Sequence, residues 1–167
     1  IRPLFPKDYL DEVQITVTAL SADGENNPDI LGIIAASAAL TLSPLPFQGP
    51  IAALRGGHVD VKLVINPTYL EAEEGRLDLV VAYGQDKVIM LEAGAKELTE
   101  DEMLNAIYSA ESDLKKVIEL QKELQSKAGK PKEKPAERVV PEEVRRKVSE
   151  AVRGEFEKVF ELGSKEA

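Results

Sequence analysis

The sequence predicts an α+β fold, in which a layer of four or five short strands surrounds one buried helix and an all-α segment follows. Three observations support this class. Short runs with alternating polar and apolar residues indicate strands. Residues 30–42 carry no charge, which is typical of a buried helix. Beyond residue 99 the apolar residues recur at helical spacing.

The first strand and the buried helix are predicted in the N-terminal quarter of the chain. Residues 12–20 alternate as a half-buried strand does, and residues 23–24 form a turn. The helix is expected to begin with Asn27 as its N-cap and Pro28 at its first position, and to end before Ser43. Because it has no polar face, we expect it to be covered on nearly all sides.

Two β-hairpins are predicted next. The first joins strands at residues 51–55 and 61–65 through the turn RGGHVD. The second joins strands at residues 77–83 and 87–92 through Gly84, Gln85 and Asp86. Together with residues 12–20, these strands make the predicted sheet layer.

Helices are predicted in the remaining part of the chain. Thr99 and Glu102 fit a capping box, and the helix behind them continues to about Gly129. Residues 131–140, PKEKPAERVV, have the composition of a linker. An amphipathic helix follows to about residue 162. We therefore divide the chain into a core at residues 1–130, a linker at 131–140 and the beginning of a helical domain at 141–167.

Composition excludes several classes of site. The chain of 167 residues has no cysteine and one histidine, so disulfides, thiolate sites and the usual zinc ligand sets are out of reach. A net charge of −9 argues against broad nucleic-acid binding but leaves room for a local basic site. No long apolar run or signal peptide is visible, so we expect a cytoplasmic protein without a membrane partner. Because the chain begins with Ile1, we expect it to be a piece of a longer protein.

Three places are candidate sites from their residue types alone. His58 in the RGGHVD turn lacks an orienting partner, so we interpret it as a surface turn residue. The carboxylates of residues 71–78 could hold Mg²⁺, although a solvated loop is the interpretation that we favour. The helix start at Asn27 could bind an anion, but Asp29 in the first turn favours a simple cap.

Four blocks of sequence resemble, in order, the first RNase PH-like domain of the bacterial polynucleotide phosphorylase family. They are the run from IRPLFPKDYLDEVQ to PFQGPIAALR, then VINPTYLE, LDLVVAYG and MLEAGAKELTEDEML. The likeness covers residues 1 to about 129, and the segment after Pro131 is similar to the start of that family's all-helical domain. The resemblance implies an RNase PH-like core, which is a layered β/α fold of the ribosomal protein S5 domain 2-like type.

The resemblance implies a phosphorolytic 3′-to-5′ exoribonuclease of RNA degradation and processing. Such an enzyme cleaves RNA with inorganic phosphate, releases nucleoside diphosphates and polymerises them in reverse as a nucleotidyltransferase. In this family a homotrimer encloses a channel for single-stranded RNA, and the full-length chain adds a second RNase PH-like domain and KH and S1 domains. Phosphate and Mg²⁺ or Mn²⁺ are expected for the full enzyme, and no cofactor is expected in this segment.

The resemblance also implies that this half of the enzyme is catalytically degenerate. The family's phosphate-binding serines fall at about Asn27 to Asp29, its paired aspartates at about Ala72 and Asp78, and its lysine at about Val80. Only Asp78 keeps the family's chemistry. Because a hydrocarbon cannot neutralise a reacting phosphoryl group, we expect no catalytic residue and no metal ligand set here.

The role expected of this half is therefore ring assembly and part of the RNA path. Arg2 is the nearest basic candidate to face RNA. The isolated segment is expected to be inactive. The alternative is a non-enzymatic RNase PH-like assembly or RNA-binding subunit of an exosome-like complex.

Overall fold

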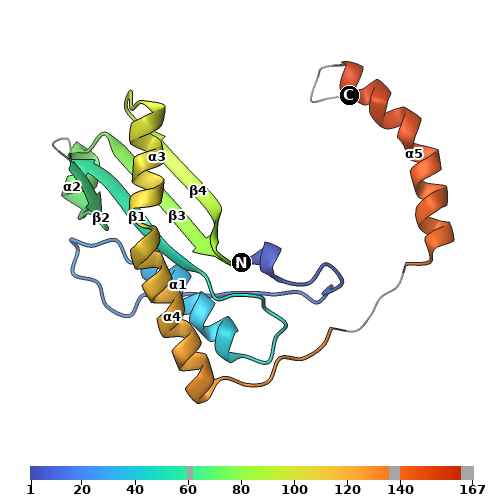
Figure 1. Ribbon diagram of the computed structural model, residues 1–167, viewed down its shortest axis with the longest axis horizontal. Helices are drawn as coiled ribbons and strands as arrows, with labels where there is room; N and C mark the ends of the chain where they lie inside the picture. The colour runs from blue at the N-terminus through green and yellow to red at the C-terminus, as the bar shows by residue number, and fades with distance from the viewer. Residues whose placement is uncertain (60–61, 136–139, 163–167) are drawn as a thin grey trace. The chain divides into compact units, whose positions relative to one another are not determined.

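The computed structural model describes residues 1–59, 62–135 and 140–162 (Figure 1). They belong to two units, Ile1–Pro135 and Ala136–Ala167. The first unit holds a sheet with helices α1 to α4, and helix α5 (Glu142–Leu162) is the described part of the second. No described helix is both long and apolar enough to cross a membrane. Residues 136–139 of the predicted linker lie outside the described residues, and the functional division into domains stays a prediction.

The sheet of the first unit has four antiparallel strands in the order β2-β1-β3-β4. They are β1 (Ala52–Val59), β2 (Lys62–Ile65), β3 (Leu77–Gly84) and β4 (Lys87–Ala95). The β3–β4 hairpin is confirmed. Gln85 and Asp86 connect its strands with positive φ angles of 51° and 58°, which match the twist of a two-residue hairpin turn.

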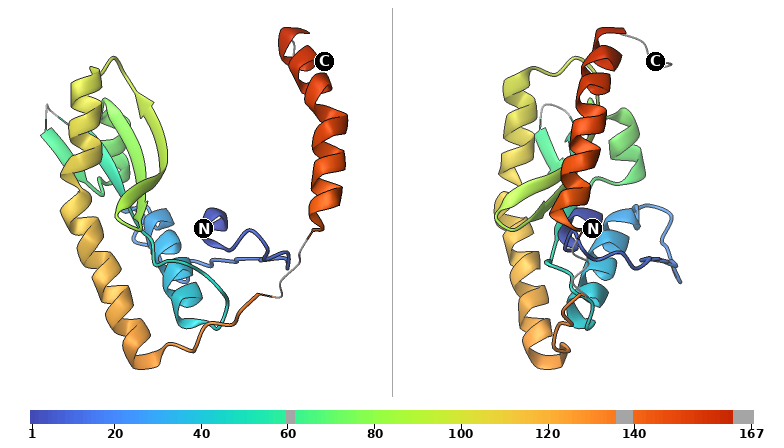
Figure 2. Two further views of the ribbon diagram at one scale, coloured as in Figure 1. Left: turned by 45° about the vertical axis from the view of Figure 1, so that its right-hand side comes forward. Right: turned by 90° about the vertical axis from the view of Figure 1, so that its right-hand side faces the viewer.

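Helices cover both faces of this sheet, as Figure 2 shows. Helices α3 (Glu100–Ser109) and α4 (Glu111–Ala128) pack on one face, and α1 (Asp29–Leu42) packs on the other. The core on the α3–α4 side consists of Ala52, Leu54, Leu77, Leu79, Val81, Tyr83, Ala106, Ala110, Leu114 and Ile118. The core on the α1 side consists of Ile30, Ala53, Val80 and Ala82. Alternate residues of β1 and β3 thus face opposite layers.

A buried hydrogen-bond network joins α1, α4 and the start of β1. The Ser37 hydroxyl donates to Gln121 Oε1 at 2.7 Å and accepts from the Ile51 N–H at 2.9 Å. Gln121 Nε2 donates to the Ile51 carbonyl at 2.8 Å. Ser37 and Gln121 are both buried. The network supplies partners for polar groups that would otherwise be costly to bury.

The prediction of a half-buried strand at residues 12–20 is wrong. This segment pairs with no other strand among the described residues, and Val17 and Leu20 are exposed to 55% and 94%. Gly32 of α1 leaves room for Val17, whose Cγ1 would lie 3.3 Å from a Cβ added there. An alternating pattern gives a strand an apolar side, but it does not supply the neighbouring backbone that a strand needs.

The predicted RGGHVD turn is also wrong over most of its length. Strand β1 continues through Arg55 to Val59, so His58 lies in the strand; the last turn residue, Asp60, lies outside the described residues. Gly57 permits this path, because a Cβ there would lie 2.9 Å from Pro67 Cγ. Glycine in a strand often marks such a close approach.

The predicted helices differ in their ends. The capping box is confirmed, since Thr99 Oγ1 accepts from the Glu102 N–H at 3.3 Å and Glu102 Oε2 accepts from the Thr99 N–H at 2.8 Å. The helix behind it breaks at Ala110 into α3 and α4. Helix α1 begins at Asp29 with Pro28 as its N-cap, one residue later than predicted, and Leu31 is 68% exposed. Helix α1 is therefore partly exposed and is not covered on nearly all sides.

Candidate functional site

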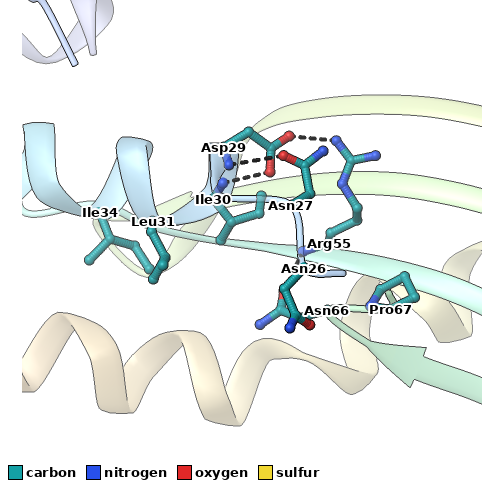
Figure 3. Close-up of a pocket in the computed structure, with 9 residues that line it drawn as sticks. All are labelled: Asn26, Asn27, Asp29, Ile30, Leu31, Ile34, Arg55, Asn66 and Pro67. Carbon is teal, nitrogen blue, oxygen red and sulfur yellow. Dashed lines mark hydrogen bonds and ion pairs between the residues drawn. The ribbon is translucent and has the colours of Figure 1, made fainter. Parts of the chain in front are cut away.

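Arg55 on β1 lies at the centre of the candidate site. Its Nη2 is 2.6 Å from Asp29 Oδ2 at the start of α1, and its Nη1 is 2.5 Å from Asp78 Oδ1 on β3. The Arg55 side chain is only 17% exposed. Figure 3 shows the guanidinium reaching toward Asp29 across the mouth of a hollow. One cation thus binds two carboxylates from two other elements.

Strand register places these groups together. Arg55 pairs with Val80 and Gly57 pairs with Asp78 across the β1–β3 ladder. Residues that are paired, or two apart on one strand, share a face of the sheet, so Arg55, Val80 and Asp78 all face the α1 layer. Burial alone would lower the pKa of Arg55, but the ion pairs with Asp29 and Asp78 outweigh it and raise that pKa above its ordinary value.

The N-terminal end of α1 is satisfied by side chains of the same segment. Asn27 Oδ1 accepts from the Asp29 N–H at 3.1 Å, and Asp29 Oδ1 accepts from the Ile30 N–H at 2.6 Å (Figure 3). An incoming anion would have to displace these oxygens and meet the Asp29 carboxylate. The interpretation of this helix start as a cap therefore agrees with the geometry.

A hollow of about 220 Å³ opens beside Arg55 (Figure 3). Its lining comprises Asn26, Asn27, Asp29, Ile30, Leu31, Ile34, Arg55, Asn66 and Pro67. Asn66 has a left-handed backbone with φ of 51°, and it exchanges two hydrogen bonds with the Arg55 backbone at 2.6 and 3.0 Å. Apart from Arg55, the polar groups here are amides and one carboxylate.

The structure brings some of the predicted site positions together and separates others. Asn27, Asp29 and Asp78 surround Arg55, and Val80 is buried on the same face. Ala72 lies on helix α2 (Tyr69–Glu74) and does not line the hollow. Arg2 lies in the short helix η1 (Arg2–Leu4), exposed and away from the hollow.

The acidic segment of residues 71–78 includes the cap of a short helix. Glu71 caps α2, where its Oε2 accepts from the Thr68 N–H at 2.8 Å, and this bond lowers the pKa of Glu71. Across the described parts of the chain, no group of three or more histidine or carboxylate side chains is placed to hold a metal ion. Asp29 and Asp78 each direct one oxygen to Arg55, whose positive charge repels a divalent cation, so this donor set does not fit such an ion.

Sequence reasoning missed Arg55. We assigned it to the end of a strand, although a single arginine within the apolar run AALRGG is itself a signal of an ion pair. Its partners are 26 and 23 residues away in sequence, so only the strand register identifies them. His58 Nδ1 is buried and has no hydrogen-bond partner among the described residues.

Comparisons with known proteins show which family the chain resembles. A family model described as "3' exoribonuclease family, domain 2" matches residues 49–113, which include Arg55, Ala72, Asp78 and Val80. The polyribonucleotide nucleotidyltransferase of Caldicellulosiruptor saccharolyticus is 46% identical over 161 residues, which is 96% of this chain. The chain belongs to the polyribonucleotide nucleotidyltransferase family. The resemblance found in the sequence blocks is thereby confirmed.

Other relatives fit this family assignment. The polyribonucleotide nucleotidyltransferase of Chloroflexus aggregans is 54% identical over 132 residues, or 79% of this chain. The chain spans 22% and 18% of these two relatives, so it corresponds to about a fifth of a family member. The crystal structure of rice (Oryza sativa) Rrp46 matches 61% of this chain and 49% of its own with a TM-score of 0.54 at 11% identity. The predicted RNase PH-like fold is confirmed.

Proposed function

We propose that this chain is a segment of a phosphate-dependent 3′-to-5′ exoribonuclease and that the segment serves ring assembly and the RNA path instead of the reaction. One observation carries the second part of the proposal. Arg55 binds both Asp29 and Asp78, the two carboxylates at positions that the sequence resemblance aligns with the family's reaction site. The names and identities of the curated relatives support the first part.

The chemistry of phosphoryl transfer supports an inactive role for this half. In-line transfer needs a cation beside the charge that develops on the reacting group. Val80 and Ala72 present only hydrocarbon, and Asp29 repels an anion. Arg55 is the cation of this site, and its two carboxylate partners already neutralise it. We derive no step through a metal here and propose that phosphate and Mg²⁺ or Mn²⁺ act in the second RNase PH-like domain.

The partners of the full-length protein follow from the same proposal. We propose a cytoplasmic homotrimer whose channel admits single-stranded RNA, with KH and S1 domains of the same chain gripping the RNA. Arg2 is our candidate for a phosphate contact along this path. It is exposed, and it lines a surface hollow with cations and rings, Lys7, Phe5 and Tyr9, and with the carboxylates Asp11 and Glu12. The cations and rings support a nucleic-acid contact, and the two carboxylates oppose it.

The direct test is phosphorolysis by the full-length protein. Single-stranded RNA is incubated with and without inorganic phosphate, and nucleoside diphosphates are measured. We expect release from the 3′ end that depends on phosphate. Absence of release in both conditions from a folded, RNA-binding protein would contradict the enzymatic proposal and favour the non-enzymatic, exosome-like alternative.

A further inference from the structure

The chain that leaves α4 folds back onto the C-terminal end of α1. The Lys130 N–H donates to the Leu42 carbonyl at 2.9 Å, and the Glu133 N–H donates to the Pro44 carbonyl at 2.7 Å. Residues 130–133, which we call the strap, thus bind a helix end almost 90 residues earlier in the sequence. The composition of this stretch had predicted a linker, yet its first half is attached to the first unit.

Within the strap, the side chain of Lys132 binds two backbone carbonyls. Its Nζ donates to the Leu40 carbonyl at 2.7 Å and to the Ser43 carbonyl at 2.8 Å. The last carbonyls of a helix lack intrahelical partners and lie at the negative end of the helix dipole, so a lysine ammonium suits this place. Lys132 forms no ion pair with a carboxylate in the part of the chain that the structure describes. Partial burial lowers the pKa of Lys132.

We propose that Lys132 is the anchor of a C-terminal cap for α1, which makes the strap part of the first unit and fixes where the chain leaves that unit. Lys132, Lys130 and Glu133 together donate to four carbonyls at the end of α1, those of Leu40, Leu42, Ser43 and Pro44, and the Leu40 carbonyl also accepts from Ser43 Oγ. Without the anchor only the two backbone bonds of Lys130 and Glu133 hold the strap, and we expect it to open more often. Four released residues would lengthen the reach to the second unit by up to roughly 14 Å.

Lys134 offers a matched comparison two residues later. Lys134 is exposed, and it makes no hydrogen bond or ion pair with any residue that the structure describes. Both lysines lie in the same KPKEKP stretch. A difference between variants of Lys132 and Lys134 therefore reports the carbonyl contacts and not the loss of a positive charge in this stretch.

Hydrogen exchange measured by mass spectrometry in the full-length protein tests the anchor. In Lys132→Gln, amides in a peptide covering residues 129–135 should exchange about tenfold faster, because charge-assisted bonds to two carbonyls are lost. Lys134→Gln should exchange as the wild type does. Lys132→Arg, which keeps a positive donor, should restore most of the protection.

The melting temperature of each variant shows that it is folded. Two results would overturn the proposal: unchanged exchange in a folded Lys132→Gln variant, or equal acceleration in Lys132→Gln and Lys134→Gln. Acceleration confined to Lys132→Gln and reversed by arginine supports the anchor. The inference does not depend on whether this half of the enzyme is catalytic.

Discussion

Arg55 binds two carboxylates from elements that are far apart in the sequence, Asp29 on α1 and Asp78 on β3. A guanidinium suits this position because its planar fork carries five N–H donors and can serve two acceptors at once. Each carboxylate gives one oxygen to Arg55 and stays partly exposed, to 41% for Asp29 and 49% for Asp78. At the scale of the residue, the site is therefore an ion-pair group that is open to solvent on its carboxylate side.

Replacing Arg55 with methionine should lower the free energy of unfolding by about 2 kcal/mol, because it leaves two carboxylates facing each other without their shared cation. Urea denaturation measures the change. Lys116→Met is the control, since it removes an exposed pair with Asp113 and should change stability by less than about 0.5 kcal/mol. Equal effects of the two substitutions would contradict a structural role for Arg55.

Asp23 shapes the turn before α1. Hydrogen bonds from the Asn26 N–H, the Asn26 side chain and the Glu25 N–H lower its pKa to about 2 from an ordinary 3.8. A depressed carboxyl pKa stabilises the folded turn above pH 3.8, and the contribution is lost as the pH falls toward 2. Carboxyl NMR titration should give a midpoint near 2, and Asn26→Ala should raise it toward 3.8. A wild-type midpoint at the ordinary value would refute this account of the turn.

At the scale of elements, Gln121 links α4 to α1 and to the start of β1. Gln121→Leu leaves the Ser37 hydroxyl without its acceptor and the Ile51 carbonyl without its donor. We expect a loss of about 2–3 kcal/mol in the free energy of unfolding, because both orphaned groups are buried. Gln125→Leu, one turn later, removes a side chain for which the described residues provide no hydrogen bond.

Chemical denaturation compares the two variants. Gln125→Leu should leave the unfolding midpoint close to that of the wild type. A Gln121→Leu variant as stable as Gln125→Leu would show that the network does not hold the three elements together.

The sequence predicted elements whose signals are local. Thr99 and Glu102 satisfy each other's backbone within one turn, and the β3–β4 hairpin combines alternation with a two-residue turn. Prediction failed where the deciding partner is distant. Residues 12–20 have the pattern of a strand, but no described strand pairs with them. Thr68 caps a helix in a segment that we interpreted as a loop.

The candidate site shows the same limit. Asp29 and Asp78 were identified as positions of interest, and the family resemblance supplied their alignment with phosphate and metal ligands. Arg55 was not identified, because its role depends on the pairing of Arg55 with Val80. Lys132 was placed in a linker, since no local pattern reveals that its ammonium reaches carbonyls about 90 residues away.

At the scale of the whole molecule, the first unit is a sheet between two helical layers, with the ion-pair group between the sheet and α1. This arrangement keeps the RNase PH-like fold, and we propose that the positions aligned with the family's reaction site hold hydrocarbon or paired charges. The chain matches about a fifth of its relatives, so the rest of a family member has room for a working site. We propose that this half contributes contact surface to the ring and forms part of the RNA path.

The measurement that tests this account most directly is the kcat of phosphorolysis by the full-length protein carrying Asp78→Asn. By the sequence resemblance, Asp78 is the one position here where we expect a carboxylate of the family's site to be kept. Because we propose that Asp78 takes no part in the reaction, we expect kcat within about twofold of the wild type. Removing a catalytic group typically lowers kcat by at least about a hundredfold. A hundredfold loss of kcat in a variant that keeps its melting temperature and its oligomeric mass would show that this half takes part in the reaction.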